Sequence, residues 1–142
     1  MQNVQVEDRR FTTLGVLVMS PPKNVLIIED DDNLRAALSR CASKHAFHVY
    51  ETSDPTTAIE LILTHSPQLL IADWDLRHAL DGVDVVRCAS IHSPHTRVVM
   101  ISGKSMSELR LVTRDLKVHI FLSKPFGLQD MTDILKTPDD SE

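Results

Sequence analysis

The stretch LLIADWDL, residues Leu69–Leu76, places four hydrophobic residues directly before an acidic pair separated by one tryptophan. A short apolar run without polar alternation is typical of a strand that is buried on both faces. The run ends at Asp73, and Asp75 follows two residues later. We therefore predict a buried strand over residues 69–73 that carries carboxylates at its carboxyl end.

On both sides of this stretch, short apolar runs alternate with longer amphipathic segments. Further strands are predicted over residues 24–30, 47–52, 97–102 and 119–123. Helices are predicted over residues 32–45, 55–65, 83–89, 105–115 and 128–136. Asp32 is predicted to be the N-cap of the first helix, and Asp54, followed by Pro55, that of the second. Strands separated by helices of about three turns form βαβ units, which predicts an α/β fold with a parallel sheet.

Length and composition narrow the function classes. The chain has 142 residues, enough for one domain with one core, and a formal net charge of -5. It contains no run of Lys and Arg, so we expect no direct contact with nucleic acid. Cys41 and Cys88 are far apart and form no CxxC pattern, which is typical of reduced thiols. No apolar run reaches the ~20 residues of a membrane span, so we expect a cytoplasmic location and no membrane contact.

The two ends of the chain differ from its middle. The segment RRFTTLGVLVMSPP, residues Arg9–Pro22, has two arginines before a short apolar run, as an export signal does. The alternatives are a flexible extension over residues 1–22 or translation that starts at Met19. The last residues, 138–142, form a polar tail. The folded domain is predicted to span residues 23–137.

Polar or charged residues stand at the carboxyl ends of the first, third, fourth and fifth predicted strands. In an open parallel sheet, ligands bind at these strand ends. The residues concerned are Glu29, Asp30 and Asp31 after the first strand, Asp73 and Asp75 after the third, Ser102 and Gly103 after the fourth, and Lys124 and Pro125 after the fifth. Taken singly, the acids are more typical of helix caps, Ser102 of a turn and Lys124 of a solvated loop. Their joint placement at one edge favours a site.

The chemistry of this set is that of phosphoryl transfer. Converging carboxylates repel one another, and Mg²⁺, which takes oxygen ligands and keeps several waters, relieves that repulsion. One carboxylate can act as a nucleophile and form an acyl phosphate. A Lys ammonium and a Ser hydroxyl then supply donors to the phosphoryl oxygens.

At this point the chain resembles the receiver domains of two-component response regulators, over about residues 23–136. VLIIEDD resembles the first-strand motif, with its acidic pair at Glu29 and Asp30. LLIADWDL resembles the third-strand motif and implies that Asp73 is the phospho-acceptor. VVMISG supplies the hydroxyl residue, Ser102, and FLSKPF supplies Lys124.

The resemblance implies a doubly wound, flavodoxin-like or CheY-like, five-stranded parallel sheet of order 2-1-3-4-5. It implies Mg²⁺ as cofactor, held by Glu29, Asp30, Asp73 and the backbone carbonyl of Asp75. It implies backbone contacts from Trp74 and Gly103 to the phosphoryl group, and a switch formed by Ser102 and Phe121. The implied partners are a histidine kinase or phosphotransfer protein, and a downstream protein at the surface of the fourth helix, fifth strand and fifth helix; a homodimer is left open. The domain would catalyse its own Mg²⁺-dependent phosphorylation and dephosphorylation, with no separate substrate.

Two departures leave alternatives open. The loop WDLRHALDG after Asp73 lacks the common proline and is one residue longer, and Asp75 adds a carboxylate at the mouth of the site. A phosphate-independent pseudo-receiver, acting as a protein-interaction module, is therefore the second interpretation. A Mg²⁺-dependent phosphatase is the third, because DWD resembles the paired aspartates of haloacid-dehalogenase-like hydrolases. Those enzymes carry the pair on their first strand, not on their third.

Overall fold

The computed structural model describes residues 23–137 and contains one parallel sheet of five strands in the order β2-β1-β3-β4-β5. The strands are β1 (Lys23–Ile28), β2 (Phe47–Thr52), β3 (Leu69–Asp73), β4 (Arg97–Ser102) and β5 (Ile120–Ser123). The predicted fold class and strand order are confirmed. This order makes β1 and β3 neighbours, although a whole βαβ unit separates them in sequence.

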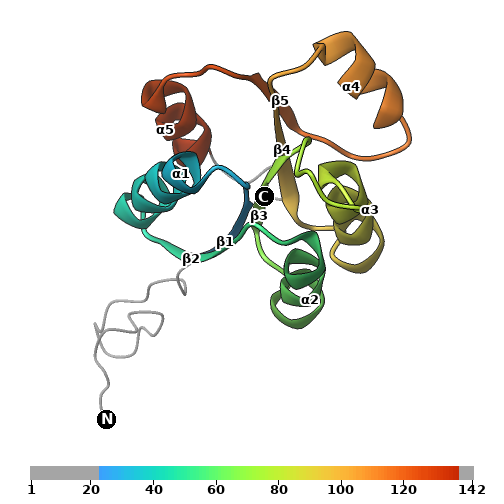
Figure 1. Ribbon diagram of the computed structural model, residues 1–142. Helices are drawn as coiled ribbons and strands as arrows, with labels where there is room; N and C mark the ends of the chain where they lie inside the picture. Colours follow the sequence, from blue (N-terminus) through green and yellow to red (C-terminus); the bar gives the residue numbers. More distant parts are fainter. Residues whose placement is uncertain (1–22, 138–142) are drawn as a thin grey trace.

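Helices cover both faces of the sheet (Figure 1). On one face lie α1 (Asp32–Lys44) and α5 (Leu128–Lys136). On the other face lie α2 (Pro55–His65), α3 (Gly82–His92) and α4 (Met106–Val112). Because every crossover passes through a helix, both faces are shielded from water, and the central strands can be hydrophobic on both sides.

Alternate residues of each strand enter two separate cores. Leu26 and Ile28 of β1 pack into the core under α2, α3 and α4. Val25 and Ile27 pack into the core under α1 and α5. All five residues of β3 are buried. The period of two in side-chain direction therefore divides one apolar run between two cores, and the strands are held firmly from both faces.

Five of the ten predicted elements have the observed bounds, and the other five differ. The strand β1 covers residues 23–28 rather than 24–30, α1 ends at residue 44 rather than 45, and β5 begins at residue 120 rather than 119. Residues 47–52, 55–65, 69–73, 97–102 and 128–136 form the elements predicted for them. The N-cap of α1 is Asp31, not Asp32: its backbone is extended, and its carboxylate accepts the Leu34 N–H at 2.9 Å. The helix α3 runs from residue 82 to 92, longer than the predicted 83–89. The helix α4 ends at Val112 rather than at residue 115. At this end the Thr113 hydroxyl bonds back to the Leu109 carbonyl at 2.8 Å, which competes with continuation of the helix.

The predicted extension over residues 1–22, the two candidate starting methionines and the tail over residues 138–142 lie outside the described residues. Among residues 23–137, no helix has both the length and the apolar character needed to cross a membrane.

Candidate functional site

The strand register brings the predicted site residues to one edge of the sheet. Ile28 of β1 is opposite Ala72 of β3, so the next residues along, Glu29 and Asp73, are neighbours across the two strands. Ser102 of β4 is opposite Ser123 of β5, which places Gly103 beside Lys124 in the same way. The residues that follow these four strands thus lie close together, because the strands end at the same edge of the sheet.

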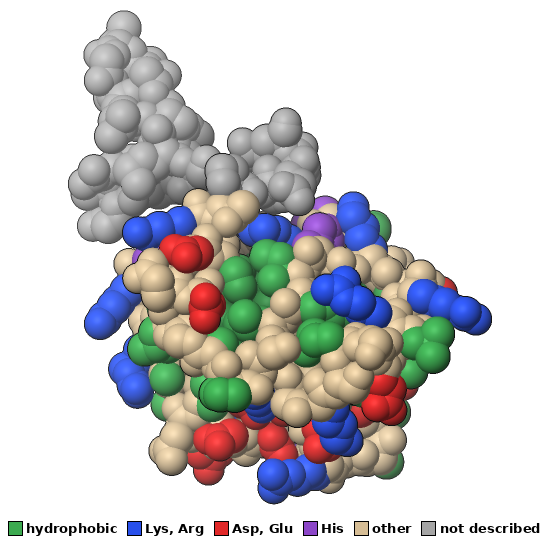
Figure 2. Space-filling view, turned by 90° about the horizontal axis from the view of Figure 1, so that it is seen from above, with side chains coloured by type: hydrophobic (Ala, Val, Ile, Leu, Met, Phe, Trp, Pro, Cys, Tyr) green, Lys and Arg blue, Asp and Glu red, His purple; other side chains and the backbone are tan. Residues whose placement is uncertain are grey.

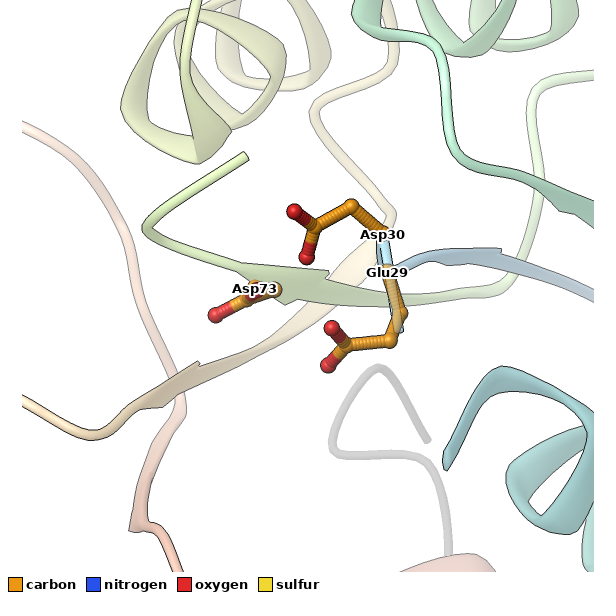
Figure 3. Close-up of side chains that lie close together, drawn as sticks. All are labelled: Glu29, Asp30 and Asp73. Atoms are coloured by element: carbon orange, nitrogen blue, oxygen red, sulfur yellow. The ribbon is translucent and has the colours of Figure 1, made fainter. Parts of the chain in front are cut away.

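Three carboxylates form the centre of this edge. One ligand oxygen each from Glu29, Asp30 and Asp73 lies within 4.8 Å of the others. Figure 3 shows the carboxyl groups of Glu29 and Asp30 extending from adjacent residues toward the strand end that carries Asp73. Glu29 and Asp73 are 1% and 2% exposed, so their mutual repulsion is poorly screened by water.

Lys124 offsets part of this negative charge. Its Nζ lies 3.0 Å from Glu29 Oε1 and 3.3 Å from Asp73 Oδ2. Glu29 Oε1 is buried, and Lys124 Nζ lies within ion-pair distance of it. The other oxygen, Glu29 Oε2, accepts the Asp31 N–H at 3.1 Å. A buried carboxylate next to two further carboxylates, with one ammonium between them, offers oxygen ligands that fit a hard divalent cation and its bound water.

The balance of charges is visible in the pKa values. Burial, and then repulsion by Glu29, raises the pKa of Asp73 to about 7, against the lowering effect of Lys124. Burial acts to lower the pKa of Lys124, but the carboxylates of Glu29 and Asp73 outweigh it and raise that pKa. Within the cluster, the Lys124 ammonium is therefore shared by two carboxylates, those of Glu29 and Asp73.

Ser102 and Gly103 form the turn after β4. Ser102 is 1% exposed, and its hydroxyl accepts the Lys104 N–H at 2.9 Å. Gly103 borders Lys124: a Cβ on Gly103 would lie 3.9 Å from the Lys124 Cβ, at ordinary contact distance. The serine hydroxyl and the lysine ammonium thus come from adjacent strand ends, as the sequence predicts.

The loop after Asp73 is fastened at several points. The Trp74 N–H continues the sheet by donating to the Ile101 carbonyl at 2.9 Å, and the Trp74 carbonyl accepts the Gly82 N–H at 3.0 Å. The Asp75 carboxylate lies 3.6 Å from Lys104 Nζ, and the same ammonium lies 5.7 Å from the centre of the Trp74 ring. A contact from the Trp74 N–H to a phosphoryl group would have to be shared with this sheet hydrogen bond.

Comparison with known proteins agrees with this geometry. The family model described as the response regulator receiver domain matches residues 25–136. The chain belongs to the response regulator receiver family. The receiver protein CpdR of Brucella abortus is 30% identical over 112 residues, a match that covers 77% of this chain and 90% of CpdR. The regulatory protein VirG of Agrobacterium fabrum is 27% identical over 111 residues, covering 78% of this chain but only 43% of VirG.

Solved receiver structures share the fold. A CheY-like receiver domain protein from Methanospirillum hungatei has a TM-score of 0.74 at 16% identity, covering 81% of this chain and 91% of that one. Members of this family interact with histidine kinases or phosphotransfer proteins and with downstream effectors, and they typically bind Mg²⁺. The acidic cluster of this receiver is compatible with that cofactor.

The predicted switch residue of the receiver lies beside α4. Phe121 is opposite Met100 in the sheet and is half-buried against the core under α2, α3 and α4. The Arg110 guanidinium of α4 stacks over its ring, 4.5 Å from the ring centre. An exposed cation on α4 thus contacts the aromatic side chain that the sequence singles out on β5.

Sequence reasoning missed two residues that shape the site. A Cβ on Gly82 would overlap the Asp73 carbonyl oxygen and would lie 2.8 Å from its carbon, so this loop requires glycine. The Asp-Gly pair at the start of α3 is the only local signal for it. Arg77 lies with φ 55° and places its Nε 3.4 Å from Asp30 Oδ2. No sequence pattern predicts that contact, because it depends on how the long loop folds.

Proposed function

We propose that this receiver accepts a phosphoryl group on Asp73 from a phosphohistidine, presented by a histidine kinase or a phosphotransfer protein. The observation that carries the proposal is the contact of one ammonium, that of Lys124, with both Asp73 and Glu29 at 3.3 and 3.0 Å. A lysine in this position pairs with Asp73 before transfer and can follow the charge onto the phosphoryl oxygens afterwards.

The transfer is written as follows. A carboxylate oxygen of Asp73 attacks phosphorus in line, the P–N bond of the phosphohistidine breaks, and its electron pair remains on the imidazole, which takes up a proton. The product is an acyl phosphate on Asp73. Lys124 and the Ser102 hydroxyl donate to the phosphoryl oxygens, with the Gly103 N–H and, in part, the Trp74 N–H as further donors. Attack of water on phosphorus then breaks the bond to the carboxylate oxygen, releases inorganic phosphate and returns the free carboxylate, so the receiver catalyses both steps on itself.

The metal ligands belong to the same proposal. When bound, Mg²⁺ supplies positive charge opposite the developing phosphoryl charge. Asp30 and Asp73 would hold the ion directly, Glu29 would hold it through a water, and the backbone carbonyl of Asp75 would be the protein's remaining ligand. The clustering of three carboxylates within 4.8 Å supports this set.

The donor has room to approach beside Lys124. An open hollow of about 350 Å³ is lined by Leu34, Lys124, Pro125 and Phe126. It lies between α1 and the turn after β5, and one of its lining residues, Lys124, contacts Glu29 and Asp73. An imidazole carried by a partner helix could enter there without displacing either core.

The output surface in this proposal is the face formed by α4, β5 and α5. Figure 2 views the molecule from the side on which α4 and α5 lie in Figure 1, and it shows hydrophobic side chains near the middle with charged side chains around them. Leu111 of α4 and Leu128 of α5 are 61% and 54% exposed. A downstream protein would bind this face, and a second copy of the chain is the other candidate.

The decisive experiment is intact-protein mass spectrometry after incubation with acetyl phosphate and Mg²⁺. We expect a mass increase of one phosphoryl group that is lost in Asp73→Asn and in EDTA. Asp75→Asn is the matched control, because it removes a nearby carboxylate and leaves the acceptor. An adduct that persists in Asp73→Asn would contradict the assignment of the acceptor.

The second interpretation, a phosphate-independent pseudo-receiver, has its own outcome. If neither acetyl phosphate nor a phosphohistidine donor gives an adduct, and beryllofluoride with Mg²⁺ leaves the protein's spectra unchanged, the chain acts as an interaction module only.

The proposal also divides the chain into an extension over residues 1–22, a receiver over residues 23–137 and a tail over residues 138–142. A fragment covering residues 23–137 that retains the phosphorylation of the full chain would support it.

A further inference from the structure

The loop between β3 and α3 brings a second cation to the acidic cluster, on Asp30 rather than on Asp73. Arg77 Nε lies 3.4 Å from Asp30 Oδ2, whereas Lys124 contacts only Glu29 and Asp73 within the cluster. The two cations therefore divide the three carboxylates between them. The mechanism proposed above gives Lys124 a role and gives Arg77 none.

The loop holds the backbone of Arg77 in place. The preceding residue, Leu76, is fully buried in the core with α2 and α3. The hydrogen bond from the Gly82 N–H to the Trp74 carbonyl closes the loop at its base. Arg77 itself has φ 55°, a left-handed conformation that costs free energy in a residue with a Cβ. The chain thus accepts local strain at the residue that contacts Asp30.

The backbone of Arg77 is held by the loop, but its guanidinium is exposed to solvent. The side chain of Arg77 is 83% exposed, whereas that of Asp30 is 18% exposed. An ion pair with so exposed a partner is weak, so it can open at little cost.

We propose that Arg77 is a displaceable cation that competes with Mg²⁺ for Asp30 and thereby sets the metal affinity of the site. A divalent ion bound by Asp30 and the guanidinium of Arg77 repel each other and need the same carboxylate. Binding of the ion therefore includes release of Arg77 into solvent. The receiver is then tuned to bind Mg²⁺ more weakly than its carboxylates alone would. The inference rests on the proposed metal site and goes beyond it, because it assigns a role to a residue outside the ligand set.

The test is a Mg²⁺ titration of the full chain, followed by the fluorescence of Trp74. This is the chain's single tryptophan, and it adjoins Asp73. Arg77→Gln removes the charge and keeps most of the side chain's length, and Arg77→Lys restores the charge. We expect Arg77→Gln to bind Mg²⁺ about threefold to tenfold more tightly, from the lost ion pair and the lost repulsion. Arg77→Lys should remain within about twofold of the original chain on the same grounds.

Lys104→Gln is the matched control. Lys104 is an exposed cation at the same edge of the sheet, but its partners are Asp75 and the Trp74 ring. Its loss changes the net charge by the same amount without freeing Asp30. The midpoint of the titration gives the affinity even where the amplitude of the Trp74 signal changes. We expect the Mg²⁺ affinity of Lys104→Gln to change by less than about twofold, because its charge lies outside the carboxylate cluster.

Thermal unfolding supplies a second readout, because a cation that binds only the folded state raises the melting temperature. Added Mg²⁺ should raise the melting temperature of Arg77→Gln more than that of the original chain or of Lys104→Gln. Equal gains in affinity in the two glutamine variants would overturn the proposal in favour of a general effect of net charge. Unchanged or weaker binding in Arg77→Gln would overturn it as well. If the original chain shows no response to Mg²⁺ and Asp30→Asn behaves identically, the metal site itself fails, and the role of Arg77 fails with it.

Discussion

At the scale of single residues, Asp73 lies where three effects oppose one another. Burial and the charge of Glu29 disfavour the carboxylate form, and Lys124 favours it. The result is a pKa of about 7 for Asp73, well above that of an ordinary carboxyl group. A buried carboxylate that is not fully neutralised reduces the stability of the folded state. The same carboxylate can bind a cation or accept a phosphoryl group.

We predict that Asp73→Asn raises the stability of the receiver in EDTA at neutral and alkaline pH. The folded-state pKa of Asp73 is about 7 and its ordinary value is 3.8, so the folded protein binds more protons between these values. Stability therefore falls as pH rises from about 4 to about 7, and asparagine removes this dependence. We expect a gain of about 3–6 °C in melting temperature at pH 8 and a smaller one at pH 5.

Thermal unfolding in EDTA across this pH range provides the measurement. Asp75→Asn is the control, because the Asp75 side chain is half exposed and pairs with Lys104 outside the cluster. A gain that is the same at pH 5 and pH 8 would contradict the explanation, because it would not follow the titration of Asp73.

The identities of the site residues could be predicted from the sequence, and the contacts of the loop could not. Glu29, Asp73 and Lys124 stand at the ends of strands, and parallel strands that end together bring their next residues together. Arg77 contacts Asp30 from a loop in which Arg77 itself has a left-handed backbone conformation and the preceding residue, Leu76, is buried. Such a conformation leaves no mark in hydrophobic periodicity. The pKa of Asp73 depends on its burial, which the apolar run before it indicates, and on the opposing charges of Glu29 and Lys124, whose distances no local pattern gives.

At the scale of elements, the start of α3 is fitted against the end of β3. Gly82 is the first residue of α3, and its Cα faces the carbonyl of Asp73 so closely that no side chain fits between them. The Asp81 carboxylate caps the helix by accepting the Val83 N–H at 2.9 Å. In return, the Asp84 carboxylate accepts the Asp81 N–H at 2.8 Å. The long loop is therefore held between a fixed strand end and a fixed helix start.

We predict that Gly82→Ala destabilises the receiver by about 1–3 kcal/mol, the range for forcing extra volume into a packed site. Its Cβ would overlap the Asp73 carbonyl oxygen, so the backbone at Asp73 and Trp74 must move. Urea unfolding gives the free energy, and the Trp74 fluorescence of the folded state reports the displacement. Gly103→Ala is the matched control at the same edge, because its Cβ would meet only the Lys124 Cβ at 3.9 Å. Equal stability of the two variants would contradict the steric argument.

Element boundaries were less predictable than element types. Asp31 and Asp32 are chemically identical candidates for the N-cap of α1, and only the extended backbone of Asp31 decides between them. The pattern of α4 continues past Val112, but the Thr113 hydroxyl bonds back to the Leu109 carbonyl. Both corrections arise from side-chain hydrogen bonds to the backbone, which compete locally with helix propensity.

At the scale of the whole molecule, the site and the proposed output face are joined by β4 and β5. Ser102 ends β4 beside the carboxylates, and Phe121 of β5 is opposite Met100, two residues earlier in β4. Arg110 connects the Phe121 ring to α4 at 4.5 Å. A shift of Ser102 toward a phosphoryl group would open space next to Phe121 and change the surface of α4, which is a population shift between two packings.

We predict that beryllofluoride with Mg²⁺, which mimics the acyl phosphate, moves the NMR resonances of α4 and β5, and that Ser102→Ala weakens this response. A hydrogen bond to a charged group contributes roughly 1.5–3 kcal/mol, so bonds from Ser102 and Lys124 together approach the ~5.5 kcal/mol that takes a 1:99 mixture to 99:1. Loss of the Ser102 bond, at about 2 kcal/mol, should lower the ratio of switched to unswitched molecules about thirtyfold at saturation. Ser90→Ala is the control, because the Ser90 hydroxyl bonds only within α3, to the Val86 carbonyl at 3.0 Å. Ser102→Ala resonances that moved as far as those of the original chain would show that Lys124 alone drives the change, and that the link from Ser102 to Phe121 does not carry it.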